Sequence, residues 1–239
     1  MHTHVLRAGA VLTAGRTAGT MLLAAVLSWL AFASPPPHED SEVGSIATKV
    51  GLSPGMVFAD VGSNDGSFAE EYLRIVRPGG GHGFATDVAS NLGFLRSRAA
   101  SLGEGALTIR AIEDPNRGLP ADGSLDAITM RMSFHYEHEP MAAAASYFRA
   151  LRPGGKLMIM EHPGCSWASM DNGSPSLAVI GQRNPFGEMS PLGNGHSLAW
   201  PPVQLNFKAA GFEVVEHGDW GGGMWMPCSW YAVFRKPVG

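Results

Sequence analysis

The chain has 239 residues, of which 45% are hydrophobic, and this is enough to bury one sizeable core in a single domain. Its formal net charge is −4 and it contains no run of basic residues, which argues against a nucleic-acid partner. The two cysteines, Cys165 and Cys228, are too few for a zinc cluster of their own and do not force a disulfide.

The N-terminal segment has the layout of a targeting signal. Residues 1–38 contain no acidic residue, and arginines precede an apolar stretch at residues 18–33 that ends in Ala31-Phe-Ala33. This layout predicts a secretory signal peptide over residues 1–34, and therefore an exported protein. The apolar stretch is shorter than the roughly 20 residues of a membrane span. An uncleaved membrane anchor, with membrane association through this segment, is the second interpretation, and an organellar transit peptide is the third.

A linker is expected over residues 35–41, which are rich in proline and acidic residues, and one domain over residues 42–239. Its first helix, at residues 42–50, is expected to stop at Gly51, a C-cap residue. Strand and helix patterns then alternate, which is typical of a parallel sheet covered by helices on both faces. The expected strands are 56–61, 82–86, 107–112, 125–131 and 156–161, and the expected helices are 67–76, 90–101, 141–151 and 203–210.

The C-terminal part departs from this alternation. Strand patterns at residues 213–217 and 230–235 flank a short glycine-rich segment without a helical pattern, which predicts a hairpin and one antiparallel strand. Residues 163–202 are rich in glycine, proline, asparagine and serine. Insertions of this length are usually functional lids or disordered linkers. We expect a substrate lid, because the insertion follows a strand end, where α/β sheets bind ligands.

A glycine-rich turn is the most informative motif. An apolar run from Val57 ends in Asp60, and a turn from Gly62 to Gly66 leads into a helical pattern. Strand, tight turn and helix in this order open a nucleotide-binding α/β unit. Asn64 stands where the dinucleotide fingerprint has its middle glycine, and asparagine tolerates a left-handed backbone better than most residues. No Walker lysine follows the glycines, which argues against a P-loop.

Two acidic residues indicate the kind of nucleotide ligand. Asp60, directly before the turn, disfavours a pyrophosphate and suits a ligand with an ammonium group. Asp87 closes the next apolar run and lies about 20 residues past the last glycine, where a carboxylate accepts hydrogen bonds from both ribose hydroxyls. Asp60 and Asn64 therefore argue against an NAD-dependent oxidoreductase.

Further motifs follow in a fixed order: Leu52-Ser-Pro-Gly-Met-Val-Phe-Ala-Asp-Val-Gly, Val76-Arg-Pro-Gly-Gly, Asp87, Leu119-Pro-Ala-Asp-Gly-Ser-Leu-Asp and Leu151-Arg-Pro-Gly-Gly-Lys-Leu. With them the chain resembles a class I S-adenosylmethionine-dependent methyltransferase over residues 43–236. Glu113-Asp-Pro, Phe134-His135 and Gly195-His196 are similar to a bacterial group of predicted methyltransferases with export signals. The resemblance implies a Rossmann-like α/β fold: a mostly parallel seven-stranded sheet, with an antiparallel last strand and helices on both faces.

The resemblance also implies which residues bind S-adenosylmethionine, the expected cofactor. Asp60 is expected at the methionyl ammonium and Asp87 at the ribose. Glu113 or Asp114 is expected at the adenine amino group, although a surface turn is the alternative for both. The full expected cofactor-binding set is Asp60, Gly62, Ser63, Asn64, Gly66, Asp87, Val88, Ile112, Glu113, Asp114 and Met132.

The candidate catalytic residues are histidines. The strand at 125–131 delivers the polar cluster Ser133–His138 to the carboxyl end of the sheet. His135 is expected to be a general base or an acceptor ligand, because histidine titrates near neutrality; the alternative is a cap on the next helix. His196, near the end of the lid, is the second candidate. Phe134 and Tyr136 are either neighbours of the sulfonium through cation–π attraction or ordinary core.

No metal is expected. Glu161-His162 ends the strand at 156–161, but the histidines and cysteines show no tight ligand spacing such as H-x-x-x-H or C-x-x-C. The expected function is methyl transfer from S-adenosylmethionine to a small-molecule acceptor, with oxygen favoured and nitrogen, sulfur and carbon open. The alternative is a binding protein that retains S-adenosylmethionine or a related nucleotide without turnover. The acceptor and the oligomeric state are not readable from the sequence.

Overall fold

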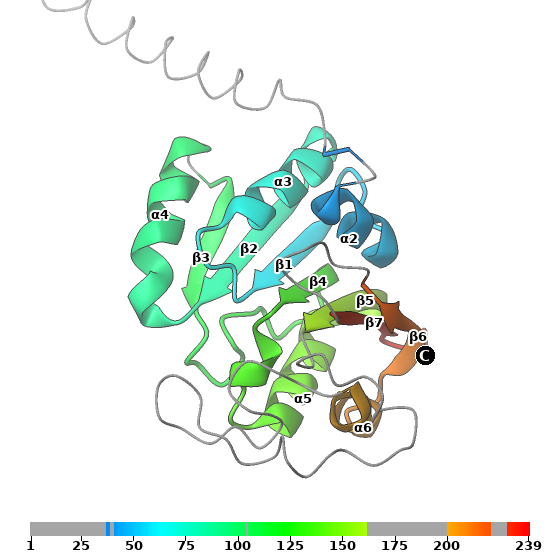
Figure 1. The fold of residues 1–239 in the computed structure, drawn as a ribbon. Helices are drawn as coiled ribbons and strands as arrows, with labels where there is room; N and C mark the ends of the chain where they lie inside the picture. The colour runs from blue at the N-terminus through cyan, green and yellow to red at the C-terminus, as the bar shows by residue number, and fades with distance from the viewer. Residues whose placement is uncertain (1–36, 39–40, 104, 162–199, 221–228) are drawn as a thin grey trace, which may run out of the picture. The chain divides into compact units, whose positions relative to one another are not determined.

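The structure, a computed structural model, describes most of a unit that spans residues 36–239 (Figure 1). The described ranges are residues 37–38, 41–103, 105–161, 200–220 and 229–239. The expected signal peptide, most of the expected lid with His196, and both cysteines lie outside them. Within the described ranges, no helix is both long enough and apolar enough to cross a membrane.

Seven strands form one sheet in the order β3-β2-β1-β4-β5-β7-β6. Strand β7 runs antiparallel to both of its neighbours, and the pairs from β3 to β5 are parallel. The predicted sheet and its antiparallel last strand are confirmed. The strands are β1 (Val57–Val61), β2 (His82–Asp87), β3 (Leu107–Ala111), β4 (Leu125–Arg131), β5 (Leu151–Glu161), β6 (Glu213–Asp219) and β7 (Trp230–Arg235).

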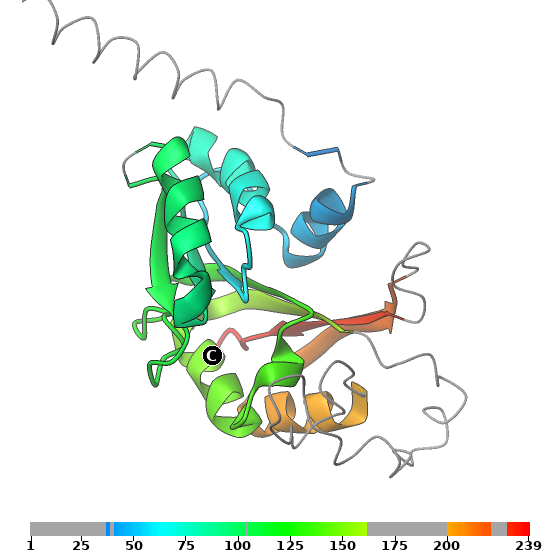
Figure 2. The same ribbon diagram turned by 60° about the vertical axis from the view of Figure 1, so that its left-hand side comes forward.

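Helices cover both faces of the sheet, as Figure 2 shows. On one face lie α2 (Glu42–Val50), α3 (Ser67–Val76) and α4 (Leu92–Ser101), and on the other lie α5 (Pro140–Ala150) and α6 (Trp200–Ala209). Three short 3₁₀ turns accompany them: η1 (Arg77–Gly79), η2 (Ala89–Asn91) and η3 (Phe134–Tyr136). Helix α2 begins where the Ser41 side chain accepts the N–H of Gly44, and it ends at Gly51, whose φ is 74°.

An aromatic cluster anchors the turn after β4 to the core. The ring of Phe207 on α6 lies 4.4 Å from Phe234 of β7 and 5.3 Å from Phe134 of η3, between ring centroids. All three side chains are fully buried. Fully burying a side chain of this size stabilises a fold by about 1.5–3 kcal/mol. The η3 turn is therefore held in place by the packing of Phe134 in the core.

Two boundaries differ from the sequence-based expectation by three residues or more. Strand β5 begins at Leu151 because this residue already pairs with Leu125, and a register shift carries the next pair to Ala127 and Lys156. The segment in between, rich in proline and glycine, bulges out of the ladder. Helix α6 begins at Trp200 rather than at residue 203. Proline is tolerated in a first helical turn, where backbone N–H groups have no intrahelical partner.

Candidate functional site

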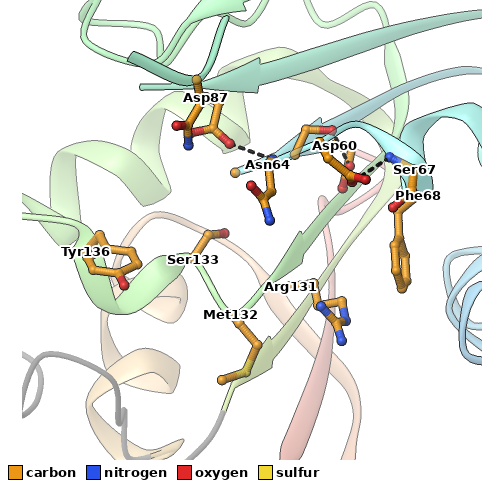
Figure 3. Close-up of a pocket in the computed structure, with 13 residues that line it drawn as sticks. Asp60, Asn64, Ser67, Phe68, Asp87, Arg131, Met132, Ser133 and Tyr136 are labelled. Atoms are coloured by element: carbon orange, nitrogen blue, oxygen red, sulfur yellow. Dashed lines mark hydrogen bonds between the residues drawn. The ribbon is translucent and has the colours of Figure 1, made fainter. Parts of the chain in front are cut away.

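A cavity of about 360 Å³ opens at the carboxyl ends of β1, β2 and β4. Strand β1 lies between β2 and β4 in the sheet. The chain therefore runs from β1 through β2 and β3 to one edge of the sheet, and then returns past β1 to β4 and the other half. Ligands of open α/β sheets bind where the strand order reverses in this way. The cavity is lined by Asp60, Gly62, Ser63, Asn64, Asp65, Ser67, Phe68, Asp87, Asn91, Arg131, Met132, Ser133 and Tyr136 (Figure 3).

Asp87, the last residue of β2, holds the glycine-rich turn in place. Its Oδ2 accepts the backbone N–H of Asn64 at 2.6 Å, and its Oδ1 accepts the N–H of Val88 and the side-chain amide of Asn91 at 2.7 and 2.9 Å. Asn64 has a φ of 52°, the left-handed backbone that its side chain tolerates. Hydrogen bonds from three donors fix the carboxylate at the cavity wall before any ligand arrives.

Asp60 places a second carboxylate deeper in the same wall. It is 4% exposed, and it accepts the hydroxyl of Ser63 at 2.5 Å and that of Thr129 at 2.9 Å. The pKa of Asp60 is raised to about 6: burial is the largest cause and the nearby Asp87 adds to it, while the two hydroxyls and Arg131 act in the opposite direction. A cation in the cavity would favour the ionised carboxylate, because opposite charges a few ångströms apart stabilise each other.

The two glycines of the turn are required by the protein itself. Gly62 has a φ of +73°, and a Cβ built on it would lie 2.7 Å from the Oγ of Ser133 and closer still to its Cβ. Ser133 is fixed there because its hydroxyl donates to the carbonyl of Val61 at 2.9 Å. Gly66, with a φ of +77°, faces away from the cavity: its Cβ would lie 3.0 Å from Leu95 of α4.

Arg98 of α4 stabilises the glycine-rich turn through contacts outside the cavity. Its Nε donates to the backbone carbonyl of Asp65 at 2.5 Å, and its two terminal nitrogens pair with Asp65 Oδ2 at 3.0 Å and Glu70 Oε2 at 2.7 Å. A guanidinium offers donors in a fixed fork, so one side chain can grip a carbonyl and two carboxylates. The sequence analysis did not identify Arg98, because the pairing depends on how α4 packs beside the turn.

The opposite wall of the cavity comes from the end of β4 and includes a positively charged side chain, Arg131 (Figure 3). The Nε of Arg131 pairs with Glu42 of α2 at 2.8 Å, and its guanidinium lies 4.9 Å from the ring centroid of Phe68. Met132 has a φ of 54°, and its N–H donates to the carbonyl of Met160 at 2.8 Å. An arginine at the end of a mainly apolar strand was a readable signal for Arg131, which the sequence analysis missed.

Six of the expected cofactor residues line the cavity, and five do not. Those at the cavity are Asp60, Gly62, Ser63, Asn64, Asp87 and Met132. Those outside its lining are Gly66, Val88, Ile112, Glu113 and Asp114.

Four of these expected cofactor residues lie just after β2 and β3. Glu113 accepts the backbone N–H of Ala89 at 2.7 Å, and Asp114 accepts a backbone N–H two residues further on at 2.6 Å. Ile112 is partly buried against the core, and Val88 is 44% exposed. Both carboxylates therefore hold the loops at this edge of the sheet.

His135 lies behind the cavity wall. Its ring is 2% exposed, and its Nδ1 lies 2.8 Å from Oε2 of Glu161. It does not line the cavity, but its ring centroid is 4.1 Å from that of Tyr136, which does. Phe134 is core. Over the ranges that the structure describes, no group of three or more histidines, cysteines or acidic residues is placed to hold a metal ion.

Comparison with known proteins places this cavity in context. The sequence profile of a family described as "methyltransferase domain" matches residues 39–217. A ubiquinone/menaquinone biosynthesis C-methyltransferase from Roseobacter denitrificans is 29% identical over 111 residues, which are 45% of this chain and 42% of that protein. The chain thus spans less than half of that relative's length.

Two solved structures share the fold. One is a SAM-dependent methyltransferase from Aquifex aeolicus, with a TM-score of 0.61 and 18% identity, covering 89% of this chain and 98% of that one. The other is a SAM-dependent methyltransferase from Methanosarcina mazei, with a TM-score of 0.59 and 16% identity, covering 81% and 98%. At these identities the likeness establishes the fold alone.

Proposed function

Because the chain belongs to the methyltransferase domain family, we propose that it transfers a methyl group from S-adenosylmethionine to a small-molecule acceptor, and that the acceptor atom is oxygen. One observation carries the proposal: two carboxylates, Asp60 and Asp87, converge on a cavity at the end of a glycine-rich turn. The chain's net charge of −4 and lack of a basic run support a small molecule over a nucleic acid.

The residues of the cavity fit S-adenosylmethionine. Asp60 is a buried carboxylate whose pKa of about 6 reflects the cost of an unpaired buried charge, and a cationic ligand offsets that cost. Asp87 would accept the ribose hydroxyls, and the backbone of Gly62 to Asn64 would lie against the ligand. When bound, S-adenosylmethionine supplies a methyl group attached to a positively charged sulfur that leaves readily.

The chain's own residues must align the acceptor and take up its proton. Tyr136 at the cavity wall, 37% exposed, is placed to contact an acceptor, and the His135 ring packs against it at a tilt of 47°. We propose His135 as the general base, because neutral imidazole accepts protons near pH 7. His196 is kept as the second candidate and lies outside the described residues.

A carbon acceptor is the second candidate reaction. Its support is the 29% identity over 111 residues to a protein whose name specifies C-methylation in quinone biosynthesis. Carbon and oxygen acceptors differ in what the base must do, because a phenolic or enolic O–H gives up its proton far more easily than most C–H groups. The two candidates are therefore separable with matched acceptors.

We also propose that residues 1–34 direct export or anchor the chain to a membrane, as in the export-signal group that the sequence resembles. The support is the acid-free, apolar composition of this segment alone. Residues 1–40 fused to a reporter enzyme would test it: a reporter that stays full-length and soluble in the cytosol contradicts both export and anchoring.

Calorimetry and product detection together test the proposed reaction. The full chain is titrated with S-adenosylmethionine, S-adenosylhomocysteine and NAD, and we expect binding of the first two only. Phenols, carboxylic acids, amines, thiols and quinols are then screened for release of S-adenosylhomocysteine. Turnover confined to amines or thiols would contradict the oxygen acceptor, and turnover of a quinol with a new C–CH₃ bond would favour the second candidate.

A further inference from the structure

A buried carboxylate and a buried imidazole form a pair behind the cavity wall. Glu161, the last residue of β5, is 0% exposed, and its Oε2 lies 2.8 Å from Nδ1 of His135, which is 2% exposed. Burying an ionisable pair is costly unless every polar atom finds a partner. The position of this pair therefore depends on the specific hydrogen bonds that Glu161 makes.

The other oxygen of Glu161 holds the backbone of the site. Its Oε1 accepts the N–H of Phe134 at 2.7 Å and that of His135 at 3.2 Å. These two residues lie between Ser133 and Tyr136, which both line the cavity. One side chain thus sets the position of the whole turn that forms this wall.

The sheet explains why these residues meet. Strands β4 and β5 are parallel neighbours, and Arg131 at the end of β4 pairs with Met160. Glu161 is the next residue along β5, so its side chain reaches the turn that follows β4. Glu161 lies on a strand and His135 lies in the short turn that follows the neighbouring strand, and a site supported by strands is held more precisely than one on loops alone.

Glu161 also determines which nitrogen of His135 carries a proton. A neutral imidazole has one N–H and one lone pair, and an ionised carboxylate only accepts hydrogen bonds. The contact with Glu161 therefore keeps the proton on Nδ1 and leaves the lone pair on Nε2. A general base must present that lone pair.

We propose that Glu161 is a positioning residue for methyl transfer: it fixes the tautomer and place of His135 and stabilises the imidazolium that forms. The proposal rests on the proposed function. In the step, Nε2 of His135 takes the acceptor's O–H proton while the oxygen bonds to the methyl carbon. The C–S bond breaks and its electron pair returns to sulfur, giving S-adenosylhomocysteine, and the imidazolium later releases the proton to water.

The tautomer is measurable without any acceptor. The full chain, labelled with ¹⁵N-histidine, is recorded by long-range ¹H–¹⁵N correlation at pH 8, and His135 is assigned by its loss in His135→Gln. We expect the Nδ1–H tautomer in the wild type. Glu161→Gln faces Nδ1 with an amide N–H, and we expect the Nε2–H tautomer there. A wild-type His135 in the Nε2–H form overturns the proposal.

Turnover gives the second readout. In Glu161→Gln we expect kcat to fall by about a hundred-fold with S-adenosylmethionine affinity nearly unchanged, because His135 in the Nε2–H form cannot act as the general base, whose contribution is roughly 10²–10⁴. Glu137→Gln is the matched control. Glu137 is also buried but contacts Tyr147 at 2.7 Å and Arg117 at 3.1 Å, so kcat and the His135 tautomer should stay as in the wild type.

The outcomes separate this proposal from the one it rests on. If His135→Gln lowers kcat and Glu161→Gln does not, Glu161 has no positioning role and methyl transfer stands. If neither variant affects kcat, His135 is not the base and both roles fall. If the wild type turns over no acceptor, the proposed function fails, and the ¹⁵N spectrum still decides whether Glu161 sets the tautomer.

Discussion

Gly62 of the glycine-rich turn and Ser133 of the β4 wall are in mutual contact, so close that a methyl group on Gly62 would overlap the Ser133 side chain. The shape of the turn is therefore matched to the β4 wall, in addition to any ligand that it binds. A glycine at this place is usually explained by the approach of a nucleotide. Here the protein alone already excludes a side chain.

This contact predicts a double-mutant result. Gly62→Ala should weaken S-adenosylmethionine binding at least ten-fold and also lower the free energy of unfolding by about 1–3 kcal/mol, because it combines a left-handed φ with overpacking. Adding Ser133→Gly removes the overlap and should recover part of both losses, measured by calorimetry and denaturant unfolding. Ser133→Gly alone is the control. Strictly additive effects would show that the two residues do not constrain each other.

Asp60 predicts a pH-dependent affinity. Its pKa is raised from 3.8 to about 6 in the folded chain, so the carboxylate is ionised only above about pH 6. S-adenosylmethionine is cationic, and we expect its affinity to rise as pH increases from 5 to 7.5. Asp60→Asn should bind more weakly and lose most of this pH dependence in calorimetry. A wild-type affinity that is flat over this range contradicts a role for the Asp60 charge.

The same residue predicts a pH effect on stability. The folded state keeps a proton that the unfolded state has lost between about pH 3.8 and 6, so this stabilising contribution is present below 3.8 and lost as pH rises through 6. At about 1.4 kcal/mol per pH unit, the loss is about 3 kcal/mol. Denaturant unfolding of Asp60→Asn against the wild type should show their difference growing over this window, and a constant difference would contradict it.

Asp87 predicts coupled losses of binding and order in the turn. Asp87→Ala removes the acceptor of the Asn64 N–H as well as the expected ribose ligand. We expect affinity for S-adenosylmethionine to fall about ten- to a hundred-fold, since hydrogen bonds to charged groups contribute about 1.5–3 kcal/mol. Amide exchange at Asn64 should accelerate in the free protein. Glu113→Ala, which alters the neighbouring loop instead, tests whether the loss is specific to Asp87.

Arg98 predicts an effect from outside the cavity. Arg98→Gln should weaken S-adenosylmethionine binding by about three- to ten-fold and stability by about 1 kcal/mol, because the turn loses a guanidinium that grips its backbone and side chain. Arg96, exposed on the same helix, supplies the control Arg96→Gln. Equal results for the two variants would mean that the Arg98 contacts do not order the turn.

The fold was largely predictable because strands such as β1 and β7 are short, mainly apolar runs. The wall of β1 and β2 was predictable too, since Asp60 and Asp87 lie directly at strand ends. At Gly66 the positive φ was foreseeable, but its contact with Leu95 was not, because it depends on the packing of α4. Pairing over long sequence separations was not readable, as for Glu161 with His135 or Arg98 with Asp65.

The strand order has a consequence for how such a cavity diversifies. Its acidic wall comes entirely from residues 60–91 and its other wall from residues 131–136, and the two meet only because β1 lies beside β4. The connecting segment between β3 and β4 contributes nothing to the lining within the described residues. A recombination point in this segment would replace the residues of one wall and keep those of the other, because each wall lies on its own continuous part of the chain.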